Sequence, residues 1–469
     1  MKELEVARAH PTRTVAPLAL ATLAFSLQQT MILPALPAFQ HEYGVSATTS
    51  TWLLTAFLLS AAITTPILGR LGDMYGKART LLVALGIFAA GSALAAVAGS
   101  FVLVLAGRTV QGTGAAIMPL AIGIVRDELP RARVAVAIGL LSSMLGIGGG
   151  AALVLAGILV DHVGLSWLFW SGFAVTAVAA VGTWAYVPDS PVRSPARIEF
   201  AGAALLSIAL LMLLLGVTEG NRWGWASPGT LALLAASVVV GYAFLRWEQR
   251  TPAPLVDIAL MRRREVWTPN LVAAAVGAAM FGSFVLIPQL AQTPASTGYG
   301  FGDSVAAAGL VLLPSAVLML VAGPLAGMLG DRFGARLPLL IGCVAAAVSY
   351  FWFALFHAAQ WQLYVGSAFL GLGLGLSLSS MGNLVVHSVP QAQTGIATAI
   401  NMIARSIGGA VGAQLAAAIL TGSTITRGFP AEGGYSTAFV VSGAAALVAW
   451  LAAVVVPRQV RVARRAAVA

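Results

Sequence analysis

Two arginines stand inside long apolar stretches of the sequence. Arg108 is followed three residues later by Gln111, and Arg405 is preceded four residues earlier by Asn401, so each pair lies on one face of a helix. A charge inside an apolar layer marks a candidate functional site, because it must bind a partner or line water. Snorkelling to the interface is the alternative for Arg108, but its amide neighbour favours a polar stripe that faces other helices. Gln28 lies at a comparable depth, and it can accept a hydrogen bond but cannot release a proton.

Single polar or bulky side chains in other apolar stretches are candidates to line a cavity. Each one alone is more readily explained as packing or as a hydrogen bond between helices. As a set they would give an apolar cavity a few polar contacts. Besides Gln28, Asn401 and Arg405, the candidates are Gln29, Met31, Trp52, Met118, Phe281, Gln289 and Asn383.

The sixteen carboxylates fall at the ends of the apolar stretches or between them. A protein that moves protons across a membrane usually needs a titratable group inside it. The nearest candidates are Asp127, Glu128 and Asp161. For Asp127 an ion pair with a neighbouring arginine is an equally good explanation, and for Glu128 it is the better one.

Chemistry that needs a metal or a cofactor finds no support in the sequence. The five histidines are scattered without metal-ligand spacing, and the lone Cys343 excludes a cysteine cluster. The glycine run Gly146–Gly150 lies inside an apolar stretch rather than after a strand, so a phosphate-binding loop is a poor interpretation. We therefore expect no cofactor, no metal and no enzymatic activity.

The composition places these residues in a membrane. The chain is 59% hydrophobic and 9% charged, whereas a soluble domain carries about 25% charged residues. A bilayer core needs about 20 apolar residues per helix, and fourteen stretches meet this requirement. They are Pro17–Pro37, Thr49–Leu68, Thr80–Ala98, Val102–Val125, Val134–Val160, Trp167–Val187, Phe200–Val217, Thr230–Leu245, Thr268–Ala291, Ser304–Met328, Leu337–Phe356, Trp361–Val386, Ile396–Leu420 and Thr437–Val456.

The positive charges sort to one side of this layout. Of the 26 Lys and Arg, only Arg108, Arg222, Arg405 and Arg427 fall outside the segments on the side of the N-terminus. By the positive-inside rule that side is cytoplasmic, and the even number of spans puts both termini there. The net charge of +10 is therefore a topology signal and a surface for anionic lipid, and nucleic-acid binding is a poor interpretation.

A loop motif occurs twice at matching positions. GRLGDMYGKAR at Gly69–Arg79 follows the second stretch, and GMLGDRFGAR at Gly327–Arg336 follows the tenth. Glycines allow tight turns and close helix packing, and an aspartate can accept hydrogen bonds at a helix N-terminus. The candidate conformational-switch residues are Gly69, Gly72, Asp73, Gly76, Lys77 and Arg79 in the first copy and Gly327, Asp331, Gly334 and Arg336 in the second.

The first copy resembles the loop signature of the major facilitator superfamily. The repeat offset of eight helices resembles its fourteen-helix drug:proton antiporter branch, in which two extra helices separate two bundles of six. Further resemblance comes from Arg108, Gln111, Gly112 and Gly114 and from Asn401, Arg405, Gly408, Gly409 and Gly412. It implies a 6 + 2 + 6 layout, with one bundle in residues 1–190, the extra pair in 191–266 and the second bundle in 267–469.

The resemblance also implies a function. We expect a monomeric, multi-pass protein of a bacterial cell membrane that exports small apolar or amphipathic compounds, such as drugs, antibiotics and natural products. Alternating access and proton antiport are implied, with the substrate, protons and lipid as partners.

Two departures from the family pattern leave alternatives open. Gln28 stands where family exporters usually carry an aspartate, and Ala152 and Leu153 replace the Gly-Pro of the fifth-helix antiporter pattern. These departures favour an uncoupled carrier or an importer as the alternative. A membrane sensor that kept the fold without transport is a second alternative.

Overall fold

The computed structural model describes residues 11–189, 200–251, 254–423 and 429–457. Within these ranges, fourteen helical segments are long and apolar enough to cross a bilayer. The predicted number of spans and the all-α polytopic fold are both confirmed. A bilayer favours this construction because a helix satisfies its own backbone hydrogen bonds.

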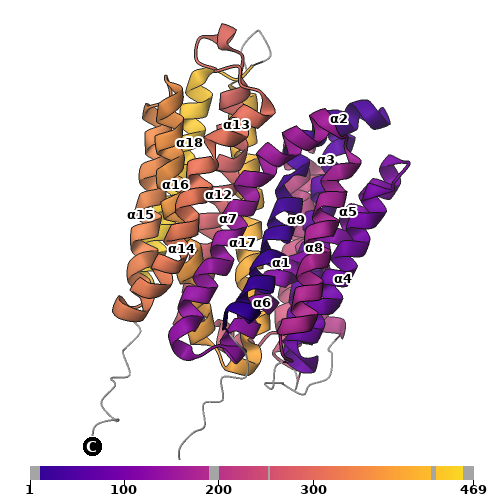
Figure 1. Ribbon diagram of the computed structural model, residues 1–469, viewed down its shortest axis with the longest axis vertical. Coiled ribbons are helices and arrows are strands. Elements are labelled where there is room, and N and C mark those ends of the chain that lie inside the picture. Colours follow the sequence, from indigo (N-terminus) through magenta and orange to yellow (C-terminus); the bar gives the residue numbers. More distant parts are fainter. Residues whose placement is uncertain (1–10, 190–199, 252–253, 424–428, 458–469) are drawn as a thin grey trace, which may run out of the picture.

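We refer to the first six spans as the N-terminal bundle (Figure 1). The first and fourth spans are each built from more than one helix, because the chain turns at Met31 and tightens into the 3₁₀ helix η1. At η1, a side-chain carbon on Gly112 would lie 2.5 Å from the Cβ of Ser60, so only glycine lets these segments approach so closely. The elements are α1 (Pro11–Thr30), α2 (Ile32–Tyr43), α3 (Ala47–Tyr75), α4 (Lys77–Ala96), α5 (Phe101–Gln111), η1 (Gly112–Ala116), α6 (Ile117–Glu128), α7 (Arg131–His162) and α8 (Ser166–Tyr186).

Two peripheral helices and the C-terminal bundle complete the chain. The two peripheral helices, α9 (Phe200–Trp223) and α10 (Pro228–Glu248), are followed by the short α11 (Ile258–Met261). The C-terminal bundle consists of α12 (Arg264–Gln292), η2 (Ala295–Thr297), α13 (Val305–Val311), α14 (Leu313–Phe333), α15 (Arg336–Leu355), α16 (Gln360–Ser388), η3 (Gln391–Gln393), α17 (Thr394–Gly422) and α18 (Glu432–Val455).

Several helices extend past the apolar stretches that predicted them. Helix α3 continues to Tyr75 although its apolar stretch ends at Leu68, and α7 begins at Arg131 although its stretch begins at Val134. Charged and polar residues are tolerated in the outermost turns because these turns reach the headgroup layer. The loop motifs therefore lie largely on helix ends.

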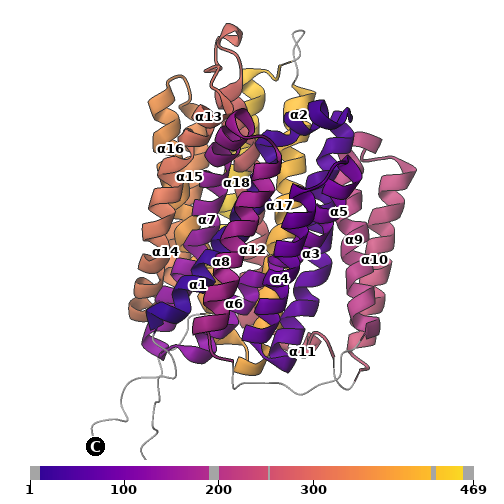
Figure 2. The ribbon, with the colours of Figure 1, turned by 45° about the vertical axis from the view of Figure 1, so that its right-hand side comes forward.

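The peripheral helices cover one seam between the bundles. Helix α9 packs through Leu210 and Leu214 against Leu59 of α3 and Ile403 of α17. Helix α10 lies outside α9 at the edge of the molecule (Figure 2). The pair thus adds an outer layer to the interface between α3 and α17.

The two bundles touch through glycines. A side-chain carbon on Gly139 of α7 would lie 2.2 Å from the carbonyl oxygen of Gly323 on α14, and one on Gly69 of α3 would lie 3.0 Å from that of Gly395 on α17. Gly327 of the second motif also meets α7, because its side-chain carbon would lie 2.5 Å from the Ala135 carbonyl oxygen. The first glycine of each motif thus serves close backbone contact with the opposite bundle.

Candidate functional site

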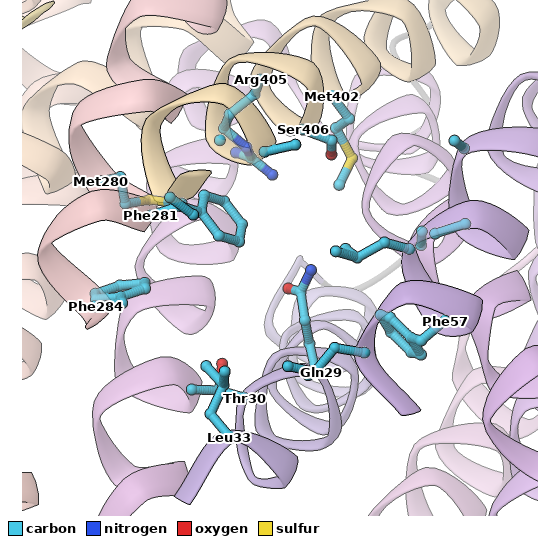
Figure 3. Close-up of a pocket in the computed structure, with 18 of the residues that line it drawn as sticks. Gln29, Thr30, Leu33, Phe57, Met280, Phe281, Phe284, Met402, Arg405 and Ser406 are labelled. Carbon is cyan, nitrogen blue, oxygen red and sulfur yellow. The ribbon is translucent and has the colours of Figure 1, made fainter. Parts of the chain in front are cut away.

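A cavity of about 540 Å³ lies between the two bundles, with walls from α1, α2, α3, η1, α7, α9, α12, α14, α16 and α17. Most of its wall is apolar, with Phe57 and Phe281 among its aromatic members (Figure 3). Such a volume and lining are typical of a small-molecule site. The polar residues in the wall are Ser26, Gln29, Thr30, Thr51, Thr55, Thr65, Thr218, Glu219, Arg222, Arg405, Ser406 and Gln414.

Three of the candidate cavity residues line this space. They are Gln29 on α1, Phe281 on α12 and Arg405 on α17. Gln29 and Arg405 come from opposite bundles, and their polar ends both project into the cavity (Figure 3). Met402 and Ser406 also line the cavity and were not predicted, although they are four residues apart on α17 and so share one face of it.

The other candidates are used elsewhere in the structure. Met31 and Met118 are buried in apolar clusters of the N-terminal bundle, and Trp52 packs in the α3–α9–α17 cluster. Gln289 is exposed on the surface of α12. Because apolar spans look alike in sequence, the face that each helix presents to the cavity could not be predicted.

Two asparagines connect neighbouring helices. The Asn383 amide donates to the Ala135 carbonyl oxygen at 3.4 Å and so bridges α16 to α7. The Asn401 amide donates to Asn270 Oδ1 at 3.0 Å and to the Pro269 carbonyl oxygen at 3.2 Å, which ties α17 to α12. Neither residue is part of the cavity wall.

Arg405 is held near the middle of α17 by tight contact with α12. A side-chain carbon on Gly277 would lie 2.1 Å from the Arg405 carbonyl oxygen and 3.0 Å from its Cγ. Gly409, one turn further, leaves room for the ring of Phe281, whose Cδ2 would lie 2.6 Å from an added carbon. These two glycines fix the arginine stem and the aromatic ring beside each other.

Arg108 is fully buried and ties three helices of the N-terminal bundle together. Its Nε donates to the Leu53 carbonyl oxygen at 3.1 Å, and its Nη1 donates to the Gln28 carbonyl oxygen at 3.1 Å and to Gln111 Oε1 at 2.8 Å. Its guanidinium carbon lies 4.3 Å from the centre of the Phe57 ring. Because Phe57 lines the cavity, Arg108 lies directly behind the cavity wall.

Gln28 completes this buried network without reaching the cavity. Its side-chain amide donates to the Leu168 carbonyl oxygen at 2.8 Å and receives a long hydrogen bond from Gln111 at 3.5 Å. Gly172 of α8 leaves the space that the Gln28 side chain fills. Gln28 therefore links α1 to α8.

The first loop motif joins the bundles on the inner side, which is the side where α1 begins and α18 ends. Asp73 is buried, and its two oxygens accept hydrogen bonds from the backbone amides of Gly395 at 3.1 Å and Ile396 at 3.0 Å. These amides belong to the first turn of α17, where the helix dipole favours an anion. Lys77 lies 3.5 Å from Asp73 and 2.7 Å from Asp127, and it is also buried.

Further contacts come from α6. We define the inner gate as Asp73, Lys77, Arg126, Asp127 and the segment 389–396 that they contact, which runs from the end of α16 through η3 into the first turn of α17. Arg126 donates to the Val389 carbonyl oxygen at 2.9 Å and to Thr394 Oγ1 at 2.5 Å. Asp127 Oδ1 accepts from the Gln391 amide at 3.0 Å. Sequence analysis did not single out these partners, because nothing in the sequence indicates which segment of the second bundle meets α6.

The remaining motif residues do not reproduce this gate. Arg79 is exposed and forms an ion pair with the half-buried Asp189 at 2.8 Å. Gly72 makes room for Leu120, and Gly76 has a φ of 112° that a side chain would strain. Asp331 is exposed and has no hydrogen-bond or ion-pair partner in the described part of the chain. In the same copy, Gly334 has a φ of 87° and Arg336 donates to the Val454 carbonyl oxygen.

Asp161 falls near the outer end of α7. The placement of its side chain lies outside what the structure describes. The residues that the structure describes contain no group of three or more His, Cys, Asp and Glu that could hold a metal ion.

We expect Asp73→Asn to lower the equilibrium constant for closure of the inner gate at least tenfold. The substitution removes the negative charge from two amide hydrogen bonds and from Lys77, and hydrogen bonds to charged groups contribute about 1.5–3 kcal/mol each. The measurement is the rate at which an impermeant maleimide, added on the inner side, labels a cysteine introduced at the buried Thr398. Asp331→Asn is the matched control, and equal labelling rates in the two variants would contradict this role for Asp73.

The family model of the Major Facilitator Superfamily matches residues 18–413 and 270–468 of the chain. The chain belongs to this superfamily. Its members are transporters, and the predicted resemblance to the drug efflux branch is supported by the relatives described next.

Curated relatives and solved structures agree with this assignment. The chain is 28% identical over 427 residues to the tetracenomycin C resistance and export protein of Streptomyces glaucescens, covering 90% of this chain and 78% of the relative. It is 28% identical over 455 residues to the multidrug efflux pump LfrA of Mycolicibacterium smegmatis, covering 94% and 89%. The crystal structure of the human organic anion transporter MFSD10 matches with a TM-score of 0.68 at 16% identity over 94% of this chain and 99% of that one, and shows the shared fold.

Proposed function

We propose that this major facilitator protein exports small apolar or amphipathic compounds by alternating access. The observation that carries the proposal is the largely apolar cavity between two bundles that are held together on the inner side by the gate around Asp73. A substrate site between repeated bundles, closed on one side, is the arrangement that a rocking carrier requires. The relatives named for antibiotic export and multidrug efflux support the same direction and substrate range.

The glycine contact between α7 and α14 supplies the test of this mechanism. A valine at Gly323 would place a carbon 2.3 Å from the Gly139 carbonyl oxygen and 2.1 Å from Ser143 Oγ. Overpacking of this kind costs about 1–3 kcal/mol. It would destabilise the conformation in which the inner side is closed. We therefore expect Gly323→Val to reduce export at least tenfold.

The measurement is the steady-state accumulation of an aromatic polyketide, a lipophilic cation and a neutral lipophilic compound in cells that lack other efflux pumps. We expect the protein to lower the accumulation of at least one compound. Gly86→Val is the matched control, because Gly86 is exposed and has open space around it. No change for any compound on expressing the protein would overturn the export proposal.

Proton antiport is the coupling that the family resemblance implies, and it needs a carboxylate that responds to the substrate. Glu219 is the one carboxylate in the cavity wall among the described residues, and it lies 3.0 Å from Arg222. Asp73 and Asp127 belong to the inner gate. An uncoupled carrier is the second candidate, because Glu219 already has a cationic partner.

A further inference from the structure

The charged groups of the cavity do not balance. Among the described residues the wall contains Glu219, Arg222 and Arg405. Glu219 and Arg222 form an ion pair at 3.0 Å near the outer end of α9. Arg405 has no hydrogen-bond, ion-pair or cation–π partner among these residues. The cavity thus carries one uncompensated positive charge near the middle of the membrane.

The surroundings of Arg405 are built to hold this charge in place. Its stem is fixed against Gly277, and the Phe281 ring lies beside it in the space left by Gly409. Its guanidinium points into the cavity, and the Gln29 side chain of the opposite bundle projects into the same space (Figure 3). A guanidinium presents several N–H donors in a planar fork and accepts no hydrogen bond, so it suits an oxyanion.

Arg108 shows how this chain satisfies an arginine that serves packing. Its Nε and Nη1 donate hydrogen bonds to Leu53, Gln28 and Gln111, and its guanidinium lies against the Phe57 ring, so only Nη2 has no hydrogen-bond partner among the described residues. Arg405 has none of these contacts although it also lies within an apolar span. A buried charge without a partner is unfavourable. An anionic ligand would pair with this charge in the cavity and would therefore bind more favourably than a neutral one.

We propose that the cavity selects amphipathic anions, with a sulfonate, carboxylate or phenolate on Arg405 and an aromatic or aliphatic body along the apolar wall. The anion would accept hydrogen bonds from the Arg405 guanidinium and from the Gln29 amide. The body would lie between Phe281 and Phe284 on one side and Phe57 on the other, all three of which line the cavity. Lipophilic cations are disfavoured, because they meet Arg405 and find Glu219 already paired. This proposal rests on the proposed export function and specifies its substrate class.

The test compares three probes of one shape with permanent charge states. They are naphthalene-2-sulfonate, its neutral N-methylsulfonamide and (naphthalen-2-yl)trimethylammonium, and their binding to the purified protein in lipid nanodiscs is measured by equilibrium dialysis. We expect the sulfonate to bind at least tenfold more tightly than the sulfonamide, and the cation more weakly than both. Arg405→Gln should remove the preference, because the sulfonate should lose at least tenfold more affinity than the sulfonamide, and Arg405→Lys should keep most of the preference. Equal or tighter binding of the cation, or an unchanged preference in Arg405→Gln, would overturn the proposal.

A transport arm separates this inference from the proposed function. The same three probes are followed in proteoliposomes that contain the wild-type protein. Export of the cation in preference to the sulfonate would support the export function and refute anion selectivity. Selective binding of the sulfonate without transport of any probe would support the anion site and refute the export function.

Discussion

Replacing Arg108 by alanine is expected to abolish export, with a loss of at least a hundredfold in rate, while the protein still inserts into the membrane. The substitution leaves the carbonyl oxygens of Leu53 and Gln28 and the Gln111 side chain without their buried donor. Each hydrogen bond to a charged group contributes about 1.5–3 kcal/mol. Phe57 also loses the guanidinium that lies 4.3 Å behind its ring, so the cavity wall itself is displaced.

The measurement separates export from folding. Efflux of a transported compound is compared with the amount of protein in the membrane and with its thermal unfolding in detergent. Arg246→Ala is the control, because this arginine is exposed and, among the described residues, its hydrogen bond and its cation–π contact are both with Tyr242 of its own helix. Normal export by Arg108→Ala would show that the buried network does not support the cavity.

The fold could be predicted from the sequence because each span is specified locally. About 20 apolar residues suffice for a helix that crosses a bilayer, and the repeated motif at Gly69–Arg79 and Gly327–Arg336 indicated that matching spans are eight helices apart. The breaks inside spans, such as the 3₁₀ segment after Gln111, were not predicted. They depend on how closely α3 approaches Gly112, and that is a property of the packed structure.

The site was predicted less completely, for a physical reason. Arg108 and Arg405 stood out equally in the sequence as charges within apolar spans. Only the structure shows that one is enclosed by partners and the other faces the cavity. The same limit applies to Gln28 and Gln29, which are adjacent in sequence but point to α8 and to the cavity respectively. Which face of a helix is turned inward is decided by its neighbours, and nearly uniform apolar spans carry little periodic signal for it.

The inner gate shows the complementary case. Two of its charges, Asp73 and Lys77, lie in a recognisable motif, but the backbone amides that Asp73 accepts from belong to residues more than 300 positions away, Gly395 and Ile396. The two motif copies also differ, because Asp73 is buried against α17 whereas Asp331 is exposed. A sequence repeat therefore predicted the matching positions of the two loops and not the asymmetry between them.

The membrane potential, rather than the pH gradient, is expected to drive export of an anionic substrate. With Glu219 paired to Arg222, no described carboxylate in the cavity wall is free to exchange a proton for the substrate. An anion that binds at Arg405 is still negatively charged when the protein releases it on the outer side. Each export event therefore moves one negative charge outward. A potential of 100 mV contributes about 2.3 kcal/mol per elementary charge, which corresponds to an accumulation ratio of about fifty-fold.

Proteoliposomes with potassium and valinomycin allow the two gradients to be imposed separately. We expect naphthalene-2-sulfonate, which cannot cross the bilayer as a neutral acid, to accumulate inside vesicles that are positive inside. At zero potential a pH gradient alone should give no accumulation, and vesicles without protein provide the control for leakage. Accumulation driven at zero potential by a pH gradient that is acidic inside would instead establish proton antiport. In that case Glu219→Gln is the decisive variant, because among the described residues only Glu219 could then bind the proton within the cavity wall.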